Sequence, residues 1–382
     1  MKHKYRFHPS EYALGENEQF YSDMEAAGWR LVKRGENLSK FEPTEPSQVR
    51  YRIEVSAPGF LEEANLSEGQ LAVFADCGWE YVDSCGLLHI FRSPAGSGAP
   101  EFYTDPRQQA ATLKKLKRNC IWGWTPAVFM LLFQWSMGFA MQGERFWPKF
   151  TAQFYRSWIE HTAILAACCA LLAWGLVLWI HDTWQISRTY YRMKKGQPLD
   201  HNPKNRHLIF KAIHRILLAV AAVFIVLAVG QLFTTVSSNL PETPEGPFLR
   251  LHELGWEGEP GSFMGKESGA MFSRSLLADH WDTVEYLGEE NSLAPWIYQD
   301  VYRLRDPSMA EALAQALMTD ATFGGEFRRL EIEGLDAAWA TEGLEILAVK
   351  GELVACITYL PDSYDSFDPQ ALCTALAQKW AQ

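Results

Sequence analysis

Hydrophobic and polar positions follow the same pattern twice within the first hundred residues. Residues 17–28 (NEQFYSDMEAAG) and 67–78 (SEGQLAVFADCG) each place apolar residues at helical spacing and end in glycine. An alternating run precedes each of these segments, and two short runs typical of strands follow it. The pattern predicts the order β-α-β-β written twice, in copies at about residues 4–44 and 49–94.

Equivalent positions of the two copies carry the same residue types. Each glycine is expected to cap the helix before it, and each tryptophan begins the strand that follows. One β-α-β-β set is too small to cover its own apolar face, so we expect residues 1–106 to form one duplicated two-layer domain, pseudo-twofold or ferredoxin-like. Whether a pocket lies between the copies stays open. The structural markers of the repeat are Gly28, Trp29 and Phe41 in the first copy and Gly78, Trp79 and Phe91 in the second.

Three long apolar segments follow the repeat. Residues 121–141, 161–180 and 216–234 contain no Asp, Glu, Lys or Arg, and each is close to the roughly 20 residues that cross a hydrocarbon core of about 30 Å. Tryptophans lie near their ends, as they do at membrane interfaces. The pattern predicts a juxtamembrane helix and three transmembrane helices within residues 107–235.

Basic residues predict the orientation of these spans. Residues 107–120 contain five basic residues and no acid, and residues 181–212 contain seven against two acids. The segments on the opposite side contain four basic residues in all. Because basic loops stay in the cytoplasm, we expect a multi-pass plasma-membrane protein with a cytoplasmic N-terminus and an extracytoplasmic C-terminus.

The C-terminal part alternates between strand and helix patterns. Residues 236–269 are rich in Pro and Gly and are expected to form a linker. Residues 270–382 contain the strand pattern Trp296–Leu304, a hairpin turning at Lys350-Gly351, and a last helix after Asp368-Pro369. The fold class predicted is an α+β membrane protein: an N-terminal duplicated β-α-β-β two-layer domain, three transmembrane α-helices and a small C-terminal α+β domain.

Charge differs sharply between the two halves of the chain. Residues 1–240 carry 26 Lys/Arg and 21 Asp/Glu, whereas residues 241–382 carry 9 and 25. Such a split favours two halves in different surroundings. The basic half lacks a dense patch with interleaved aromatic residues, which argues against a nucleic-acid partner. The first twenty residues lack the apolar core of a signal peptide.

The sequence contains no recognised catalytic, cofactor or metal motif. The pair Cys168-Cys169 is surrounded by small residues, and close helix packing explains it more simply than a metal site. Cys356 and Cys373 either form a disulfide or remain free thiols. Four tryptophans of the C-terminal domain line a pocket or pack in a core. We therefore expect no catalytic, cofactor-binding or metal-binding residues.

The segments "AGWRLVK", "FADCGWEYV", "FRSP" and "FYTD" resemble the bacterial domain-of-unknown-function family 2812 over about residues 4–106. The resemblance implies a membrane-anchored member, since hydrophobic spans usually follow the domain in this family. It also implies a Gram-positive source and a gene near a PadR-like transcriptional regulator. The family has no established activity, so it supplies no catalytic residues.

Two hypotheses of function follow. The first is a non-enzymatic sensory or regulatory adaptor that links an extracytoplasmic domain to a cytoplasmic one and contacts the lipid bilayer and a protein partner. The second is an accessory subunit of a membrane transport or export complex, whose spans pack against a larger protein. An enzyme with an unrecognised site in the acidic domain is a third reading.

Overall fold

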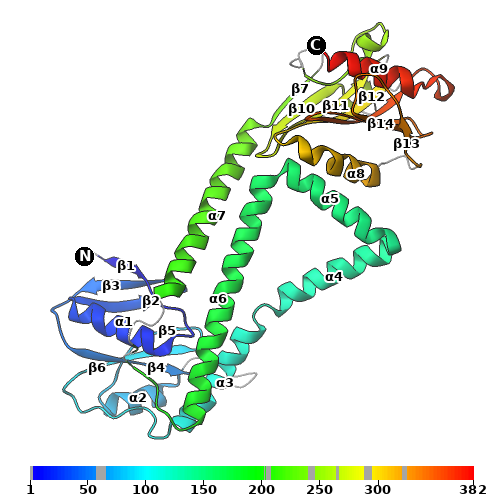
Figure 1. Ribbon diagram of the computed structural model, residues 1–382. Helices are drawn as coiled ribbons and strands as arrows, with labels where there is room; N and C mark the ends of the chain where they lie inside the picture. Colours follow the sequence, from blue (N-terminus) through cyan, green and yellow to red (C-terminus); the bar gives the residue numbers. More distant parts are fainter. Residues whose placement is uncertain are drawn as a thin grey trace. The chain divides into compact units, whose positions relative to one another are not determined.

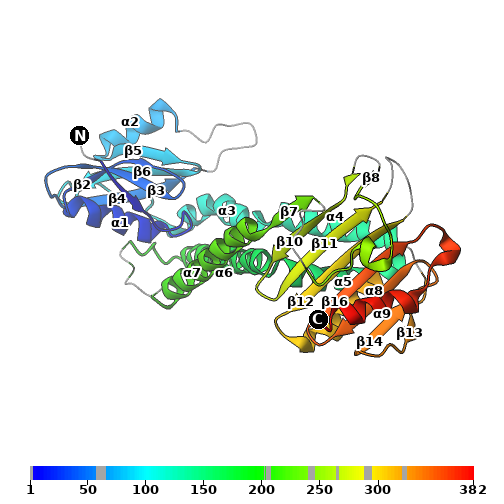
Figure 2. The ribbon, with the colours of Figure 1, turned by 90° about the horizontal axis from the view of Figure 1, so that it is seen from above.

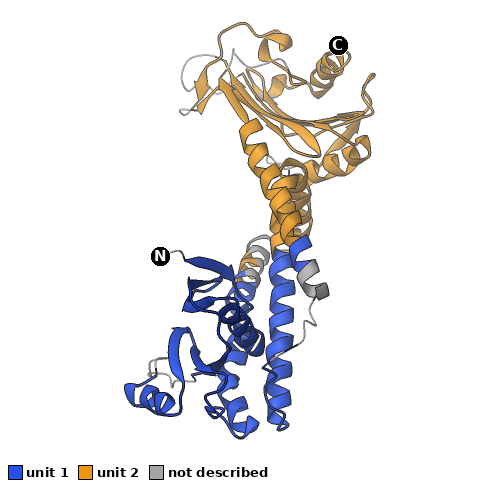
Figure 3. Ribbon diagram, turned by 90° about the vertical axis from the view of Figure 1, so that its left-hand side faces the viewer, with its two compact units in different colours: residues 1–132, 172–216 blue, residues 133–171, 217–382 orange. Residues whose placement is uncertain are grey.

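The computed structural model describes residues 3–56, 66–201, 203, 208–239, 246–263, 266–287, 295–320 and 325–382. It is a mixed α+β protein with β-sheets, and two of the helices in the described ranges are long and apolar enough to cross a membrane (Figure 1). The chain divides into two compact units (Figure 3). Unit 1 comprises residues 1–132 and 172–216, and unit 2 comprises residues 133–171 and 217–382.

Unit 1 begins with two successive strand-helix-strand-strand sets. The described strands form two antiparallel three-stranded sheets, ordered β1-β3-β2 and β4-β6-β5 (Figure 2). A ferredoxin-like fold has one continuous sheet covered by helices. These strands form two sheets, so the fold is not ferredoxin-like. The elements are β1 (Lys4–Phe7), α1 (Leu14–Ala26), β2 (Trp29–Arg34), β3 (Leu38–Pro43), β4 (Val49–Val55), α2 (Glu68–Asp76), β5 (Glu80–Cys85) and β6 (Leu88–Pro94).

Both sheets share details beyond strand order. The pairing of β2 with β3 shifts register between Leu31 and Lys33, and that of β5 with β6 shifts between Tyr81 and Asp83, fifty residues later in each case. Such a shift marks an irregularity of the bulge type. Gly28 and Gly78, after α1 and α2, have φ angles of +81° and +84°. L-residues with a side chain rarely adopt this conformation, which explains glycine at both positions.

The two helices of these sets pack differently. α1 buries Leu14 and Tyr21 and contacts both β2 and β4, so that it lies against strands of both sheets. α2 has no fully buried residue; its Leu71 and Phe74 pack at the edge of a small cluster around Trp79 and Phe91. α1 is therefore part of the main core of unit 1, whereas α2 covers a separate, smaller one.

Two further helices complete the core of unit 1. α3 (Pro106–Trp122) buries Leu113 and Leu116 in it. α6 (Thr162–Lys194) is one helix of 33 residues, and its Ile186 and Met193 are buried in the same core. The sequence predicts that the second span ends at residue 180 and that a loop follows. Instead the helix continues to Lys194, because its later residues pack against the N-terminal domain.

The three predicted spans differ in how well the observed helices fit the length and hydropathy of a transmembrane helix. α6 and α7 (Leu208–Thr234) each contain a long, strongly apolar stretch, of which only 11% is buried. The first predicted span is divided: its first residues belong to α3, and α4 (Thr125–Gln142) follows after a break at Gly123. Three transmembrane helices are thus not confirmed, whereas two helices meet the length and hydropathy that a span needs.

Unit 2 is built on an eight-stranded sheet with the order β13-β14-β15-β16-β12-β11-β10-β7. The described partners in it all pair antiparallel. Its strands are β7 (Val236–Asn239), β10 (Gly269–Arg274), β11 (Ala278–Tyr286), β12 (Trp296–Leu304), β13 (Arg328–Leu330), β14 (Ala337–Ala340), β15 (Glu345–Lys350) and β16 (Leu353–Leu360).

Helices cover both faces of this sheet (Figure 1). α8 (Ala310–Asp320) and α5 (Phe146–Glu160) bury apolar residues on one face, and α9 (Pro369–Lys379) does so on the other. Asp368 caps α9 through its side chain, as the sequence predicts. The short elements η1 (Gly143–Arg145), η2 (Leu251–Leu254), η3 (Pro307–Met309), η4 (Tyr364–Ser366), β8 (Ser262–Phe263) and β9 (Lys266–Glu267) complete the unit.

The segment expected as a linker contributes to the fold of unit 2. β7 pairs with β10, and Phe248, Leu249 and Leu251 are buried in the core beneath α9. The described part of the segment is therefore packed in the unit and does not form a linker. Residues 240–245 and 264–265 of the predicted linker lie outside the described residues.

Candidate functional site

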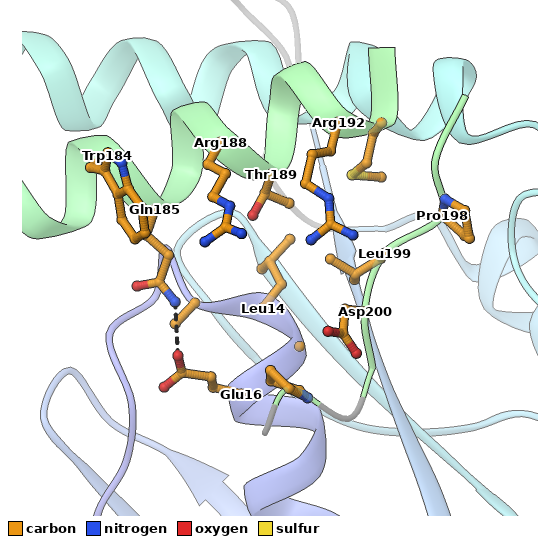
Figure 4. Close-up of a pocket in the computed structure, with 14 residues that line it drawn as sticks. Leu14, Glu16, Trp184, Gln185, Arg188, Thr189, Arg192, Pro198, Leu199 and Asp200 are labelled. Carbon is orange, nitrogen blue, oxygen red and sulfur yellow. Dashed lines mark hydrogen bonds between the residues drawn. The ribbon is translucent and has the colours of Figure 1, made fainter. Parts of the chain in front are cut away.

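A cavity of about 100 Å³ lies in unit 1 where the start of α1 meets the second half of α6 (Figure 4). Arg188 and Arg192 extend from α6 toward it, and Leu14 and Leu199 supply apolar surface. The two arginines are four residues apart and therefore lie on one face of the helix. The cavity combines guanidinium groups with the first turn of α1, whose exposed N–H groups carry partial positive charge.

Backbone packing fixes the wall of this cavity. A Cβ atom at Gly15 would lie 2.0 Å from the carbonyl oxygen of Asp200, so only glycine allows the segment after α6 to approach α1 this closely. Gln185 donates a hydrogen bond of 3.0 Å to Glu16 across the cavity. Paired guanidinium groups can hold an anionic group, whereas Glu16 and Asp200 lower the net positive charge there.

Buried carboxylates connect α1 to its surroundings. Glu18, 1% exposed, accepts a hydrogen bond of 2.9 Å from the backbone N–H of Ile53 and another from His201. Ser10 donates to Asp182 of α6 at 2.8 Å. These bonds hold α1 between β4 on one side and α6 with the segment after it on the other.

A second carboxylate, Glu25, lies near the other end of α1. It is fully buried, and it accepts hydrogen bonds from the Tyr51 hydroxyl and, at 2.9 Å, from Arg92. Tyr51 lies on β4 and Arg92 on β6, so one helix of the first set is joined to two strands of the second. Burial of the tyrosine beside this carboxylate raises the pKa of Tyr51 far above its usual value.

Glu54 has the least favourable surroundings for a charge among these acids. The Tyr103 hydroxyl donates a hydrogen bond of 2.5 Å to its carboxylate. Burial raises the pKa of Glu54 to about 7, and the tyrosine hydrogen bond offsets only part of this shift. Glu54 is therefore a group of unit 1 whose charge changes near neutral pH.

Unit 2 contains a cluster of charged and aromatic residues beneath α5. Arg156 of α5 donates to Glu160 at 2.8 Å and to Asp300 of β12 at 3.1 Å. His280 lies 3.0 Å from Asp300 and stacks on Tyr302 with ring centroids 4.3 Å apart. Although burial opposes ionisation of Asp300, the hydrogen bond from His280 and the charge of Arg156 outweigh it and hold its pKa below the usual value.

The end of α5 is fixed by three further hydrogen bonds. The Tyr302 hydroxyl donates to the Glu160 carboxylate at 2.6 Å, and Ser275 donates to the carbonyl of Ile159 at 2.6 Å. The Gln231 side chain of α7 donates to the carbonyl of Glu160 at 2.6 Å. The junction of α5 with α6 is thus joined to both the sheet and α7.

The repeat markers serve structural roles. Phe41 and Phe91 are fully buried, in the main core and in the smaller cluster respectively. Trp79 is 2% exposed and donates to the carbonyl of Pro100 at 2.8 Å, whereas Trp29 is only partly buried under Lys4. These markers do not gather in one place, and the cavity of Figure 4 is lined by other residues.

Cys356, Cys373 and Trp256 of unit 2 are explained by packing. Cys356 and Cys373 are free, and they pack in the cores on opposite faces of the sheet, which excludes a disulfide between them. Trp256 donates to the Tyr359 hydroxyl at 2.7 Å and packs against the core beneath α9. Within the described residues, no group of three or more His, Cys, Asp or Glu side chains could hold a metal ion.

The sequence pattern does not predict the residues of the cavity or of the two buried clusters. Arg188, Arg192, Glu18 and Arg156 are isolated charges in segments that read as loops or amphipathic helices. Their partners lie between 4 and 183 residues away along the chain. The one local signal was the spacing of Arg188 and Arg192, which becomes visible only once the second span is known to continue as a helix.

The N-terminal part of the chain matches a known family. Residues 13–124 match the family model described as "Protein of unknown function (DUF2812)". This confirms the resemblance drawn from the repeated segments and extends it through α3. No curated protein and no solved structure matches the chain.

Proposed function

We propose that this chain is a non-enzymatic sensory or regulatory adaptor of the bacterial plasma membrane that links an extracytoplasmic C-terminal domain to a cytoplasmic N-terminal domain. The observation that carries the proposal is the continuity of α6. Residues 162–171 of this helix belong to unit 2, and residues 172–194 belong to unit 1, where Ile186 and Met193 are buried. A displacement or rotation of such a helix would alter packing in the N-terminal core.

The proposed topology has three spans, formed by α4, α6 and α7, with the N-terminus in the cytoplasm. The distribution of basic residues supports it: twelve basic residues lie in segments 107–120 and 181–212, against four on the other side. The balance of 9 basic and 25 acidic residues in 241–382 also suits an extracytoplasmic domain.

We further infer that the N-terminal domain arose by duplication of a β-α-β-β unit. The shared strand order, the matching register shifts fifty residues apart and the two glycines of positive φ support this inference. The domain would then serve as a compact platform for a protein partner. The cavity beside Arg188 and Arg192 would let a small anionic ligand alter the contact of α6 with α1.

Hydrogen exchange in the full-length protein in nanodiscs tests the link between the units. Arg156→Ala removes the guanidinium that Asp300 and Glu160 share, and Arg303→Ala, at a half-exposed pair with Glu352 (3.6 Å), is the control. The adaptor proposal predicts faster exchange in α1 and in residues 182–193 for Arg156→Ala alone. Faster exchange confined to unit 2 would contradict it.

The alternative is an accessory subunit of a transport or export complex. The exposed apolar side chains of α6 and α7, such as Leu172, Val226 and Phe233, favour it as surfaces for a larger membrane protein. Co-purification of partners with the full-length protein in mild detergent distinguishes the two proposed functions. The variant Phe7→Glu/Val73→Glu changes only exposed side chains of the N-terminal domain, whereas deletion of residues 1–106 would uncover Leu113. An adaptor's partner is lost with this variant, and a partner bound through the spans is retained.

A further inference from the structure

α5 carries a row of aromatic side chains that are partly exposed. Trp147, Phe150 and Phe154 are 51%, 37% and 50% exposed, and Trp158 continues their row. The spacing of three, four and four residues places the four side chains on one side of the helix. Successive rings stack along it, at 6.3 Å between Phe150 and Phe154 and 6.4 Å between Phe154 and Trp158.

The opposite face of α5 is fixed on the C-terminal sheet. Ala152 and Ile159 are buried, and α5 packs against α8 and β11. Arg156 is held by Glu160 and Asp300, as described above. The rotation of α5 about its own axis is therefore set by these contacts, so the aromatic row must point away from the sheet.

α5 is too short to cross a bilayer. Its 15 residues extend over about 22 Å, whereas a hydrocarbon core measures about 30 Å. Only His161 separates α5 from α6, whose apolar window is one of the two long enough for a span. The aromatic row thus lies directly before that helix in the sequence.

The charges on α5 complement a lipid surface. Arg145, just before the helix, and Lys149 within it are exposed, and no acidic residue occurs between them and Glu160. Exposed basic side chains beside aromatic rings match anionic phosphates above an apolar layer. A helix with one apolar face, basic residues and too little length to span is typical of a helix in the interfacial plane.

We propose that α5 lies in the membrane–water interface, with Trp147, Phe150, Phe154 and Trp158 inserted at the boundary between headgroups and acyl chains. The opposite face then holds the C-terminal domain against the membrane surface. This inference rests on the proposed membrane anchoring. It adds that the C-terminal domain is attached to the lipid surface through α5.

Hydroxyl-radical footprinting of the unmodified full-length protein tests the inference. The purified protein is placed in phosphatidylglycerol-containing nanodiscs at one chain per disc, and oxidation at each residue is read by mass spectrometry relative to its rate in the unfolded chain. Tyr5 and Met271, which are 58% and 40% exposed in the N- and C-terminal domains, report contact with water. Phe233 of α7, which is 84% exposed, reports contact with lipid.

The expected result is that Trp147 and Phe154 are oxidised at least fivefold more slowly than Tyr5 and Met271, as Phe233 is. Oxidation of Trp147 and Phe154 at the rate of Met271, with Phe233 protected, overturns the inference and leaves membrane anchoring intact. Oxidation of Phe233 as well contradicts the anchoring itself. Protection of Trp147 that appears only at two chains per disc assigns the face to a second copy and also overturns the inference.

Discussion

At the scale of single residues, buried acids in unit 1 differ in how their charge is balanced. Glu25 is fully buried beside Arg92 and Arg30, and Glu18 lies beside His201 and a backbone N–H group. Glu54 has a tyrosine hydroxyl instead, and burial raises its pKa to about 7. The folded protein therefore binds a proton at Glu54 that the unfolded chain has released above its ordinary pKa of 4.5.

Replacement of Glu54 by Gln should change the pH dependence of stability. In the wild type, Glu54 lowers the free energy of unfolding as pH rises from about 4.5 to 7, by up to about 3 kcal/mol. The Gln variant lacks this decline, so its stability relative to the wild type should rise over that window and stay constant above it. Melting temperatures of the full-length protein between pH 5 and 8.5 measure the effect. The same change at exposed Glu68 should leave the profile unaltered.

Gly28 and Gly78 should tolerate alanine poorly. Both have φ near +80°, and a Cβ at Gly28 would also lie 3.1 Å from the carbonyl oxygen of Thr44. Each Ala variant should lose about 1–2 kcal/mol of unfolding free energy because a side chain strains this conformation. Gly69→Ala is the control, since nothing lies within 4 Å of its Cβ position inside α2, and it should be neutral or stabilising. Equal losses in all three variants would refute this explanation.

At this scale, local features could be predicted from the sequence, whereas contacts between distant residues could not. Gly28 and Gly78 could be predicted because a helix end and a following strand are local patterns. The partners of Glu25 could not, because Tyr51 and Arg92 are brought to it only when α1 packs across the second sheet. Local periodicity contains no information on which sheet a helix will cover.

At the scale of secondary-structure elements, α6 departs most from its prediction. Hydropathy falls after residue 180, so the sequence predicts a loop there. Nothing in residues 181–194 breaks a helix, however, and Gly196, with a φ of +82°, follows its end. Ile186 and Met193 were the available signal, since their spacing of seven places them on one face.

Ile186→Ala should weaken the packing of α6 in unit 1. The side chain is fully buried, and its truncation should cost about 2–5 kcal/mol. Hydrogen exchange of α1 and of residues 182–193 should increase in the full-length protein. The same substitution at Ile180, which is 54% exposed on the same helix, serves as the control and should change little. Unchanged exchange in Ile186→Ala would mean that α1 does not depend on α6.

At the scale of the whole chain, the sequence predicts the C-terminal strands and hairpin well, but it predicts the limits of the linker and of the spans poorly. The strand Trp296–Leu304 and the hairpin before and after Gly351 were predicted correctly, since alternation and turn residues are local. The linker was not, because β7 and Phe248 are ordered by partners thirty or more residues away. Hydropathy predicts three spans, but it does not predict the helix break at Gly123, which divides the first of them.

The proposed topology predicts opposite labelling of two positions. Cys77 is exposed in the N-terminal domain, and Leu276, 47% exposed in the C-terminal domain, accepts a cysteine without loss of packing. In intact cells, a membrane-impermeant maleimide should label L276C and should reach Cys77 only after permeabilisation. Peptide mass spectrometry distinguishes the two sites from the other thiols. Labelling of Cys77 in intact cells would reverse the proposed orientation.

α1 and α2 differ in how many side chains they bury, and this difference affects which positions of such proteins can change during evolution. α1 contributes Leu14, Tyr21 and two buried carboxylates to its surroundings, so most changes along it carry a folding penalty. α2 buries no residue completely, and selection for packing therefore acts weakly on most of its positions. α1 is therefore constrained by packing, whereas α2 tolerates substitutions at most of its positions. Lineages that acquire new binding specificity should accumulate their substitutions on α2, where novelty and foldability are not in conflict.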